Sequence, residues 1–421
     1  MLKKKSWVKA GFAASIVFGS LLAGCSGDDG TGNTEAGGED GETTVTLTGW
    51  QSSPTEQRLF EEVLADFEEE NPDINVEIDT IADQYMDVLR TRLVGGEAAD
   101  VFFLDSFEAP GLIETGAVEP LDDYVEEDFN LDDFQEPMIQ AFERDDQLWG
   151  IPKDTSNLAL FYNKDLLEEA GFDGPPETWE ELEDMAEELT TEDTVGFGIV
   201  TDLARLMFMP EAHGGSVVED NRANFTDPAV IDAYEPLIEM RNEEDTAASP
   251  GDVGANNGGE MFGKEDAAMI IEGNWTIPFL EDTFPDVNYG TAEVPTINGE
   301  NGTMAFTVGY AMNAASENKD AAWKLIEYLA GEEGMENWTS SGLTLPTRES
   351  VVEEMEYNEP EIYEPFLAGS EYATVWVDDT NLPIINSNFE NQFNSAFIGE
   401  QSLEEAMEKA EESANNEISD E

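Results

Sequence analysis

Between residues 45 and 200, segments with the two-residue apolar spacing of a strand alternate with segments that have the spacing of a helix. Ile74, Val76 and Ile78 are spaced by two, as in a half-buried strand, whereas Tyr85, Val88 and later apolar residues have helical spacing. The predicted strands are 45–48, 74–78, 101–104, 158–162 and 195–200, and the predicted helices are 59–67, 85–93 and 178–189. Strands that alternate with helices favour an α/β fold with mostly parallel sheets and flanking helices.

Capping signals fix the starts of two of these helices. Ser53 and Glu56 form a capping box with Pro54 at the first helical position, and Thr178 and Glu181 form a second box.

The first 25 residues have the layout of an exported lipoprotein. Lys3, Lys4, Lys5 and Lys9 precede an apolar stretch that is shorter than the ~20 residues needed to span a bilayer. The stretch ends in Leu22-Ala23-Gly24-Cys25, where small residues lead to a thiol that can accept lipid. We expect residues 1–24 to be a signal peptide, Cys25 to be lipidated, and the glycine-rich acidic residues 25–43 to form a flexible tether.

Size and cysteine content limit how the rest of the chain is stabilised. Without its signal the chain still exceeds the ~250 to 300 residues at which one core stops growing, so two lobes are expected. Cys25 is the only cysteine, so packing must stabilise the fold without disulfides.

The charge is strongly negative, with 96 Asp and Glu against 18 Lys and Arg. Such a field repels nucleic acid and anionic lipid, and it favours a neutral or cationic ligand. Because ~1 M salt shortens the screening length to ~3 Å, the acidic excess suggests a salt-loving or alkaline habitat.

Five groups of motifs occur in a fixed order along the chain. They are Trp50 with 71–76; 99–105; 149–152 with 160–166 and 176–182; 262–269 with 273–275; and 318–323 with 345–348. In this order the motifs resemble the extracellular solute-binding proteins of sugar ABC importers, the family that contains maltose-binding protein. The resemblance covers nearly all of the chain after its signal.

The resemblance implies a two-lobed periplasmic-binding-protein-like fold with the ligand in a cleft between the lobes. Lobe one would hold residues 44–154 and 305–345, and lobe two residues 155–304 and 346–421. The implied protein is a monomer without catalytic activity, cofactor or metal. It passes a carbohydrate to the transmembrane subunits of an ABC permease and stays extracytoplasmic, held to the cell membrane through lipid on Cys25.

A sugar offers flat C–H faces and a rim of hydroxyls, so its site needs aromatic rings together with carboxylates or amides. Trp275 matches the stacking tryptophan of the family, and Asp105 follows an apolar strand at the expected cleft mouth. The candidate binding residues are Trp50, Gln51, Asp105, Ser106, Asp154, Ser156, Trp275, Tyr310 and Trp376. Ser156 stands where maltose-binding protein has a glutamate, which argues against an identical ligand.

Two other functions stay open on sequence grounds. A glycosidase needs only two carboxylates, and no spacing among the acidic residues selects or excludes a pair. A cell-surface interaction protein would also suit the tether and the acidic surface. Serine hydrolases are disfavoured because the chain has no Gly-x-Ser-x-Gly elbow, and zinc sites because it has one histidine and one cysteine.

Overall fold

The computed structural model describes residues 43–50, 54–81, 84–355, 360–377 and 380–420. The predicted signal peptide, Cys25, the tether up to residue 42 and Gln51 lie outside the described residues. The predicted tether is one residue too long, because Thr43 already begins the first strand and pairs with Ile74.

A single mixed sheet of ten strands forms the centre of the fold. Its order is β10-β7-β11-β6-β13-β3-β1-β2, with β12 added beside β6 and β14 beside β13. The strands are β1 (Thr43–Gly49), β2 (Ile74–Thr80), β3 (Val101–Asp105), β6 (Ile151–Asn163), β7 (Val195–Gly198), β10 (Ala247–Ala248), β11 (Ala267–Gly273), β12 (Tyr289–Ala292), β13 (Met304–Met312) and β14 (Thr374–Val375). Two small hairpins lie outside it, β4 (Glu143–Arg144) with β5 (Gln147–Leu148) and β8 (Val218–Glu219) with β9 (Arg222–Ala223).

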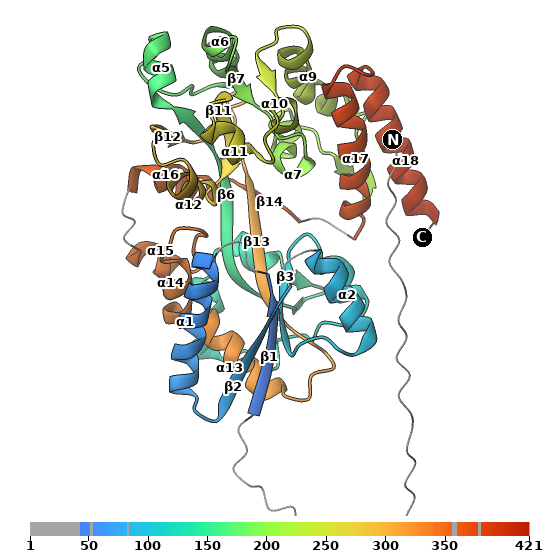
Figure 1. The fold of residues 1–421 in the computed structure, drawn as a ribbon. Helices are drawn as coiled ribbons and strands as arrows, with labels where there is room; N and C mark the ends of the chain where they lie inside the picture. The colour runs from blue at the N-terminus through green and yellow to red at the C-terminus, as the bar shows by residue number, and fades with distance from the viewer. Residues whose placement is uncertain (1–42, 51–53, 82–83, 356–359, 378–379, 421) are drawn as a thin grey trace, which may run out of the picture. The chain divides into compact units, whose positions relative to one another are not determined.

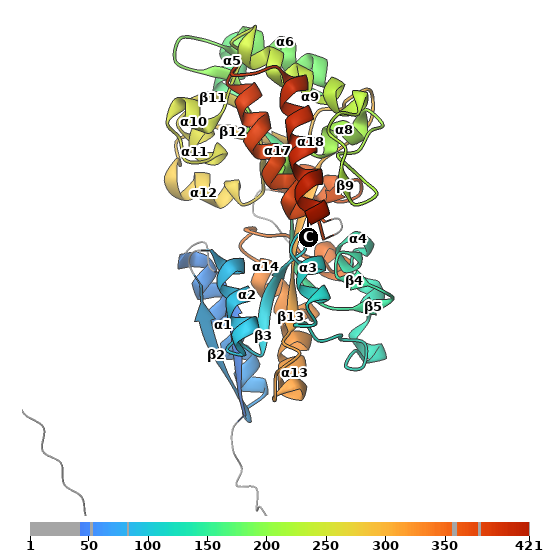
Figure 2. The same ribbon diagram turned by 90° about the vertical axis from the view of Figure 1, so that its right-hand side faces the viewer.

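Helices flank this sheet (Figures 1 and 2). They are α1 (Pro54–Glu70), α2 (Tyr85–Gly95), α3 (Ala109–Glu114), α4 (Glu136–Gln140), α5 (Lys164–Ala170), α6 (Trp179–Leu189), α7 (Leu203–Leu206), α8 (Phe208–Ala212), α9 (Pro228–Asn242), α10 (Pro250–Val253), α11 (Gly258–Gly263), α12 (Thr276–Thr283), α13 (Lys319–Leu329), α14 (Glu332–Thr339), α15 (Glu349–Glu354), α16 (Pro360–Gly369), α17 (Leu382–Phe397) and α18 (Leu403–Asp420), with short 3-10 turns at Glu127–Phe129 and Leu131–Asp133.

The long strand β6 connects the two halves of the sheet. Its first part, residues 151–157, pairs antiparallel with β13, which continues to β3. Its second part, residues 158–163, pairs antiparallel with β11 and β12. On either side the outer pairs β1–β2, β1–β3, β7–β10 and β7–β11 are parallel. The predicted α/β class with two sheet regions is therefore confirmed, and the junction between them lies along β6 and β13 (Figure 1).

Two large apolar clusters lie on opposite sides of this junction. The first cluster contains Phe67, Phe102 and Phe142, and the second contains Tyr234 and Phe389. The predicted lobe boundaries stay a prediction.

The start of the last segment differs from that prediction. Val351, assigned above to lobe two, packs in the first cluster, and Arg348 donates to Asp133 and lies over the Phe134 ring at 4.1 Å. The reason is that a buried guanidinium needs a carboxylate, which Asp133 of the first half supplies.

Local chemistry explains where helix α6 sits. Thr178 caps it as predicted by accepting from the Glu181 N–H at 3.2 Å, but Glu181 accepts from the Glu177 N–H at 2.9 Å and not from the Thr178 N–H, so the reciprocal half of the predicted box is not formed. The helix then packs closely on β7, because a Cβ at Gly196 would come within 2.1 Å of the Ala186 carbonyl oxygen.

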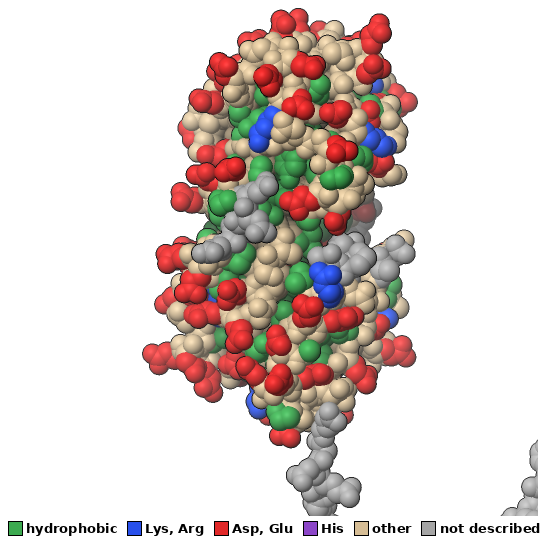
Figure 3. All heavy atoms as spheres, turned by 60° about the vertical axis from the view of Figure 1, so that its left-hand side comes forward, with side chains coloured by type: hydrophobic (Ala, Val, Ile, Leu, Met, Phe, Trp, Pro, Cys, Tyr) green, Lys and Arg blue, Asp and Glu red, His purple; other side chains and the backbone are tan. Residues whose placement is uncertain are grey.

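Carboxylates dominate the face of the molecule drawn in Figure 3, where Lys and Arg side chains are few. Among the described residues no helix is both long enough and apolar enough to cross a bilayer.

Candidate functional site

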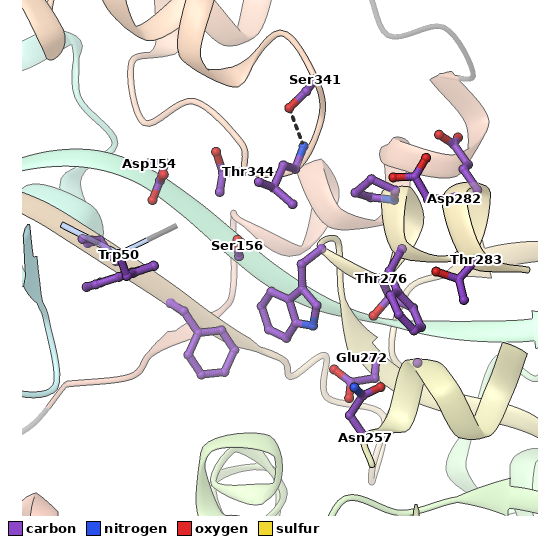
Figure 4. Close-up of a pocket in the computed structure, with 18 of the residues that line it drawn as sticks. Trp50, Asp154, Ser156, Asn257, Glu272, Thr276, Asp282, Thr283, Ser341 and Thr344 are labelled. Atoms are coloured by element: carbon purple, nitrogen blue, oxygen red, sulfur yellow. Dashed lines mark hydrogen bonds between the residues drawn. The ribbon is translucent and has the colours of Figure 1, made fainter. Parts of the chain in front are cut away.

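A cavity of about 800 Å³ opens beside β6 at the junction of the two halves. Four of the predicted site residues line it, namely Trp50, Asp154, Ser156 and Trp275. Apolar rings and polar side chains share the lining, and Figure 4 shows Asp154 and Ser156 along β6 with Glu272 and Asn257 toward one end. A cavity of this size, apolar with a few placed polar groups, is typical of a small-molecule site.

Trp275 is fixed by its neighbours between β11 and α12. Its six-membered ring lies over Gly273, where a Cβ would come within 2.3 Å of the ring. Phe306 contacts it edge to face at 5.7 Å between centroids, and the Arg205 guanidinium carbon lies 5.6 Å from the ring centre. Buried Asn274 holds the preceding turn by donating to the Leu343 carbonyl and accepting from the Asn157 N–H. The indole is thus a rigid, partly exposed wall of the cavity.

Asp154 lies in a buried ion pair at the centre of β6. Its Oδ2 accepts from the Trp338 Nε1–H at 2.7 Å and from Lys153 Nζ. The Lys153 and Asp154 side chains are only 4% and 6% exposed, and the ammonium lies 4.0 Å from the Trp338 ring centre. Lys153 also lines the cavity, but its charge is already paired and covered by aromatic rings.

Trp50 also borders a second, smaller cavity of about 440 Å³. The ring of Trp50 makes edge contacts with Tyr85 at 4.9 Å and Phe103 at 5.4 Å between centroids. Asp105 at the end of β3 lines this second cavity, and its Oδ1 accepts from the Phe107 N–H at 2.9 Å. Burial raises the pKa of Asp105 to about 6 despite that hydrogen bond, and the nearby Glu108 and Asp154 carboxylates act in the same direction.

This raised pKa predicts a specific pH dependence. The folded protein binds the Asp105 proton more tightly than the unfolded chain does. Protonated Asp105 therefore contributes fully to the free energy of unfolding below pH 3.8, and this contribution is lost as pH rises through 6. Asp105→Asn keeps the acceptor for the Phe107 N–H and should stabilise the protein at pH 8. A pKa raised from 3.8 to about 6 corresponds to ~3 kcal/mol, and partial exposure reduces our expectation to about 1–2 kcal/mol.

The measurement is urea unfolding of wild type and Asp105→Asn at pH 4 and pH 8. The free energies of unfolding of the two proteins should differ only at pH 8. Asp286→Asn, at an exposed position, is the control for loss of one charge. An equal gap at both pH values would contradict the account.

The other predicted residues lie behind the cavity walls. Ser106 is 1% exposed and donates to the Trp376 carbonyl at 3.0 Å, while the Trp376 ring stacks on Phe107 at 5.0 Å. Phe107 lines the second cavity, so Ser106 and Trp376 support that wall from behind.

Tyr310 lies in neither cavity, in contrast to our expectation. It is fully buried in the first cluster against Phe103. Val308, two positions earlier on the same face of β13, lines the large cavity, whereas Tyr310 lies further along the strand, where the first cluster covers it.

Several lining residues were missed by the sequence analysis. The most distinctive are Arg205 and Glu272, which pair at 3.4 Å between Arg205 Nη2 and Glu272 Oε2. A signal for Glu272 existed, because it is a carboxylate that ends an apolar strand, as Asp105 does. Arg205 carried no comparable signal.

No group of three or more His, Cys, Asp or Glu side chains that could hold a metal ion occurs within the described part of the chain.

Comparison with known proteins gives one family match and several relatives. The model of the family described as "Bacterial extracellular solute-binding protein" matches residues 51–336. A binding protein of Brucella abortus is 28% identical over 301 residues, covering 68% of this chain and 72% of that protein. The galactooligosaccharide-binding protein of Bacillus subtilis is 25% identical over 306 residues, covering 68% and 69%.

Solved structures agree in fold. The ABC substrate-binding protein of Listeria monocytogenes, solved with cycloalternan, superposes with a TM-score of 0.82 at 23% identity, covering 90% of this chain and 99% of that one. MalE, the sugar-binding protein of Xanthomonas citri, has a TM-score of 0.77 at 22% identity, covering 90% and 98%. These matches confirm the two-lobed fold and the resemblance seen in the sequence motifs.

Proposed function

The chain belongs to the family of bacterial extracellular solute-binding proteins, and we propose that it captures a neutral carbohydrate and delivers it to an ABC-type membrane permease. As a member of that family it is a binding protein that works outside the cytoplasm, and it is not an enzyme. The relatives named for galactooligosaccharides and the neighbour solved with cycloalternan support a sugar as ligand.

The observation that carries the proposal is the composition of the large cavity. Trp275, Phe306 and Trp50 offer ring surfaces for the C–H faces of a sugar, and Asp154, Ser156 and Glu272 offer acceptors for its hydroxyls. The two cations of the lining, Lys153 and Arg205, are already paired with carboxylates. An anionic solute would therefore find no free cation among these lining residues, which favours a neutral one.

A scan of thermal unfolding tests the ligand class. Residues 26–421 in molar salt are heated with mono- and oligosaccharides, polyols, glycerol phosphates and peptides in turn. A ligand at 100 times its Kd adds ~2.7 kcal/mol to the folded state, which raises Tm by several degrees. A rise with a sugar that is then recovered intact supports the proposal. Consumption of the sugar would favour a glycosidase, and no rise with any compound would favour a surface-interaction role.

We further propose that the protein is a monomer anchored through lipid on Cys25. The support for the anchor is the residue pattern of 1–25, which lies outside the described residues, and the monomer is what the resemblance to the family implies. Cells fed an alkyne-labelled fatty acid should label the wild-type protein and leave Cys25→Ser unlabelled. Equal labelling of both proteins, or release of both into the medium, would contradict the anchor.

The charge of the chain also predicts that salt stabilises it. With 96 acidic residues against 18 basic ones, repulsion in dilute buffer should be relieved by screening, and we propose a salt-loving or alkaline habitat. Tm should rise by several degrees between 0.05 M and 1 M NaCl, and KCl of equal ionic strength should act alike. A Tm that does not rise with salt would contradict the proposed habitat.

A further inference from the structure

Glu272 has one carboxylate oxygen that the protein leaves unbonded. The residue is 2% exposed, yet it lines the large cavity. Its Oε2 accepts from Arg205 Nη2 at 3.4 Å and from the Gly273 N–H at 3.2 Å, and within the described residues no hydrogen bond reaches Oε1. Oε1 has room only because position 258 is glycine, where a Cβ would come within 2.5 Å of it. Because only 2% of the residue is exposed, little water reaches this oxygen at the cavity wall, so a donor from a ligand would stabilise it.

The charges around Glu272 do not balance. Arg205 Nη1 also pairs with Asp202 at 3.1 Å, so one guanidinium serves two carboxylates. Burial raises the pKa of both Glu272 and Asp202, and Arg205 offsets only part of that rise. Each Nη group of Arg205 is engaged with a carboxylate, so its single positive charge is already shared between two anions and leaves no excess for an incoming third one.

The position of Trp275 indicates where a ligand hydroxyl could donate to Glu272 Oε1. Arg205 contacts Glu272 by an ion pair and lies 5.6 Å from the centre of the Trp275 ring, so the three side chains form one corner of the cavity. A sugar unit stacked on this indole would turn its hydroxyl rim toward the carboxylate.

We propose that Glu272 is a specificity-determining residue, with Oε1 accepting a hydrogen bond from a hydroxyl of the sugar unit stacked on Trp275. Arg205 is the positioning residue that holds the carboxylate in place. Sugar acids are rejected at this corner because they would bring a second anion to a carboxylate that Arg205 does not fully neutralise. The inference rests on the proposed function.

Glu272→Gln replaces the acceptor that faces the cavity at this corner with a donor. Arg205 Nη2 requires an acceptor, so the amide oxygen stays with it and the NH₂ group turns toward the cavity. A hydrogen bond to a charged group is lost, which predicts roughly 10- to 150-fold weaker sugar binding. Glu272→Asp keeps the charge but withdraws the oxygen by one methylene, so it should weaken binding as well and replaces Glu272→Gln if that variant does not fold.

Asp202→Asn is the matched control. It removes one negative charge from the same ion-pair group, keeps a side chain that can cap α7, and lies outside the cavity lining. If Glu272 acts only through charge or structure, the two variants should behave alike. If Glu272 touches the sugar, Asp202→Asn should change affinity by less than about threefold while Glu272→Gln loses it.

The experiment is titration calorimetry of the full mature chain with maltotriose, cellotriose, mannotriose and trigalacturonic acid. We expect at least one neutral trisaccharide to bind, trigalacturonic acid not to bind, and Glu272→Gln alone to lose affinity. Binding of a neutral trisaccharide equally well by Glu272→Gln, or equal losses in both variants, would overturn this inference and leave the proposed function standing. Tight binding of trigalacturonic acid by the wild type would overturn the inference and also contradict the preference for a neutral ligand. If no neutral trisaccharide binds the wild type, the proposed function fails and the inference fails with it.

Discussion

Asp154→Asn should lower the free energy of unfolding by about 3–5 kcal/mol, because it leaves the Lys153 ammonium buried without a counter-charge. The Lys153 side chain is 4% exposed, and apart from Asp154 its recorded contacts are the Trp338 and Phe103 rings. Because so little of the side chain reaches the cavity, water replaces the lost interaction only poorly. Urea unfolding at pH 7 measures the loss.

A double-mutant cycle shows whether the pair is the cause. Lys153→Met removes the charge and keeps an unbranched side chain, so the double variant Lys153→Met/Asp154→Asn carries no buried charge at this place. The free energy of unfolding that the double variant loses should be well below the sum of the losses of the two single variants, with a coupling energy of about 1–3 kcal/mol. Additive losses would mean that the pair does not act as a unit.

Trp275→Ala should weaken sugar binding by roughly 30- to 1,000-fold, about 2–4 kcal/mol, and remove the sugar-dependent rise in Tm. The reason is that the indole is a partly exposed ring of the cavity wall, held in place by Gly273, Phe306 and Arg205. Trp275→Phe retains a smaller ring and should give an intermediate loss. Titration calorimetry with the sugar selected by the thermal scan measures both.

Trp149→Ala serves as the matched control for this substitution. Trp149 is partly buried at the edge of the first cluster, donates through Nε1 to the Arg144 carbonyl, and lines neither cavity. It should cost stability while sugar affinity stays within about twofold. If Trp149→Ala weakened binding as much as Trp275→Ala, the stacking role would be wrong.

The alternation of strands and helices was predictable because it depends on spacing alone. The strand at 74–78 and the helix at 178–189 appear at their predicted places. Alternating apolar residues determine the strand, and an apolar face with a threonine N-cap determines the helix. The ends of the elements were harder to predict. Thr43 belongs to β1 because it pairs with Ile74, whereas the predicted end of the tether was chosen from composition alone.

The site was only partly predictable because spatial neighbours are distant in sequence. Trp275 and Asp154 were chosen from the family motifs and both line the cavity. Tyr310 was misplaced because side-chain alternation gives the face of a strand but not the point along it where a cavity ends; Val308 on the same face reaches the cavity and Tyr310 does not. Arg205 and Glu272 are 67 positions apart, and only the fold brings their charges together.

The central claim is that the cavity beside Trp275 binds a neutral sugar without altering it. Titration of the mature protein in 1 M NaCl with each neutral trisaccharide, followed by mass analysis of the sugar, tests it most directly. The account predicts saturable binding of one molecule per chain by at least one sugar, which is recovered intact. Absence of binding by all of them, or recovery of shorter fragments, would contradict the account.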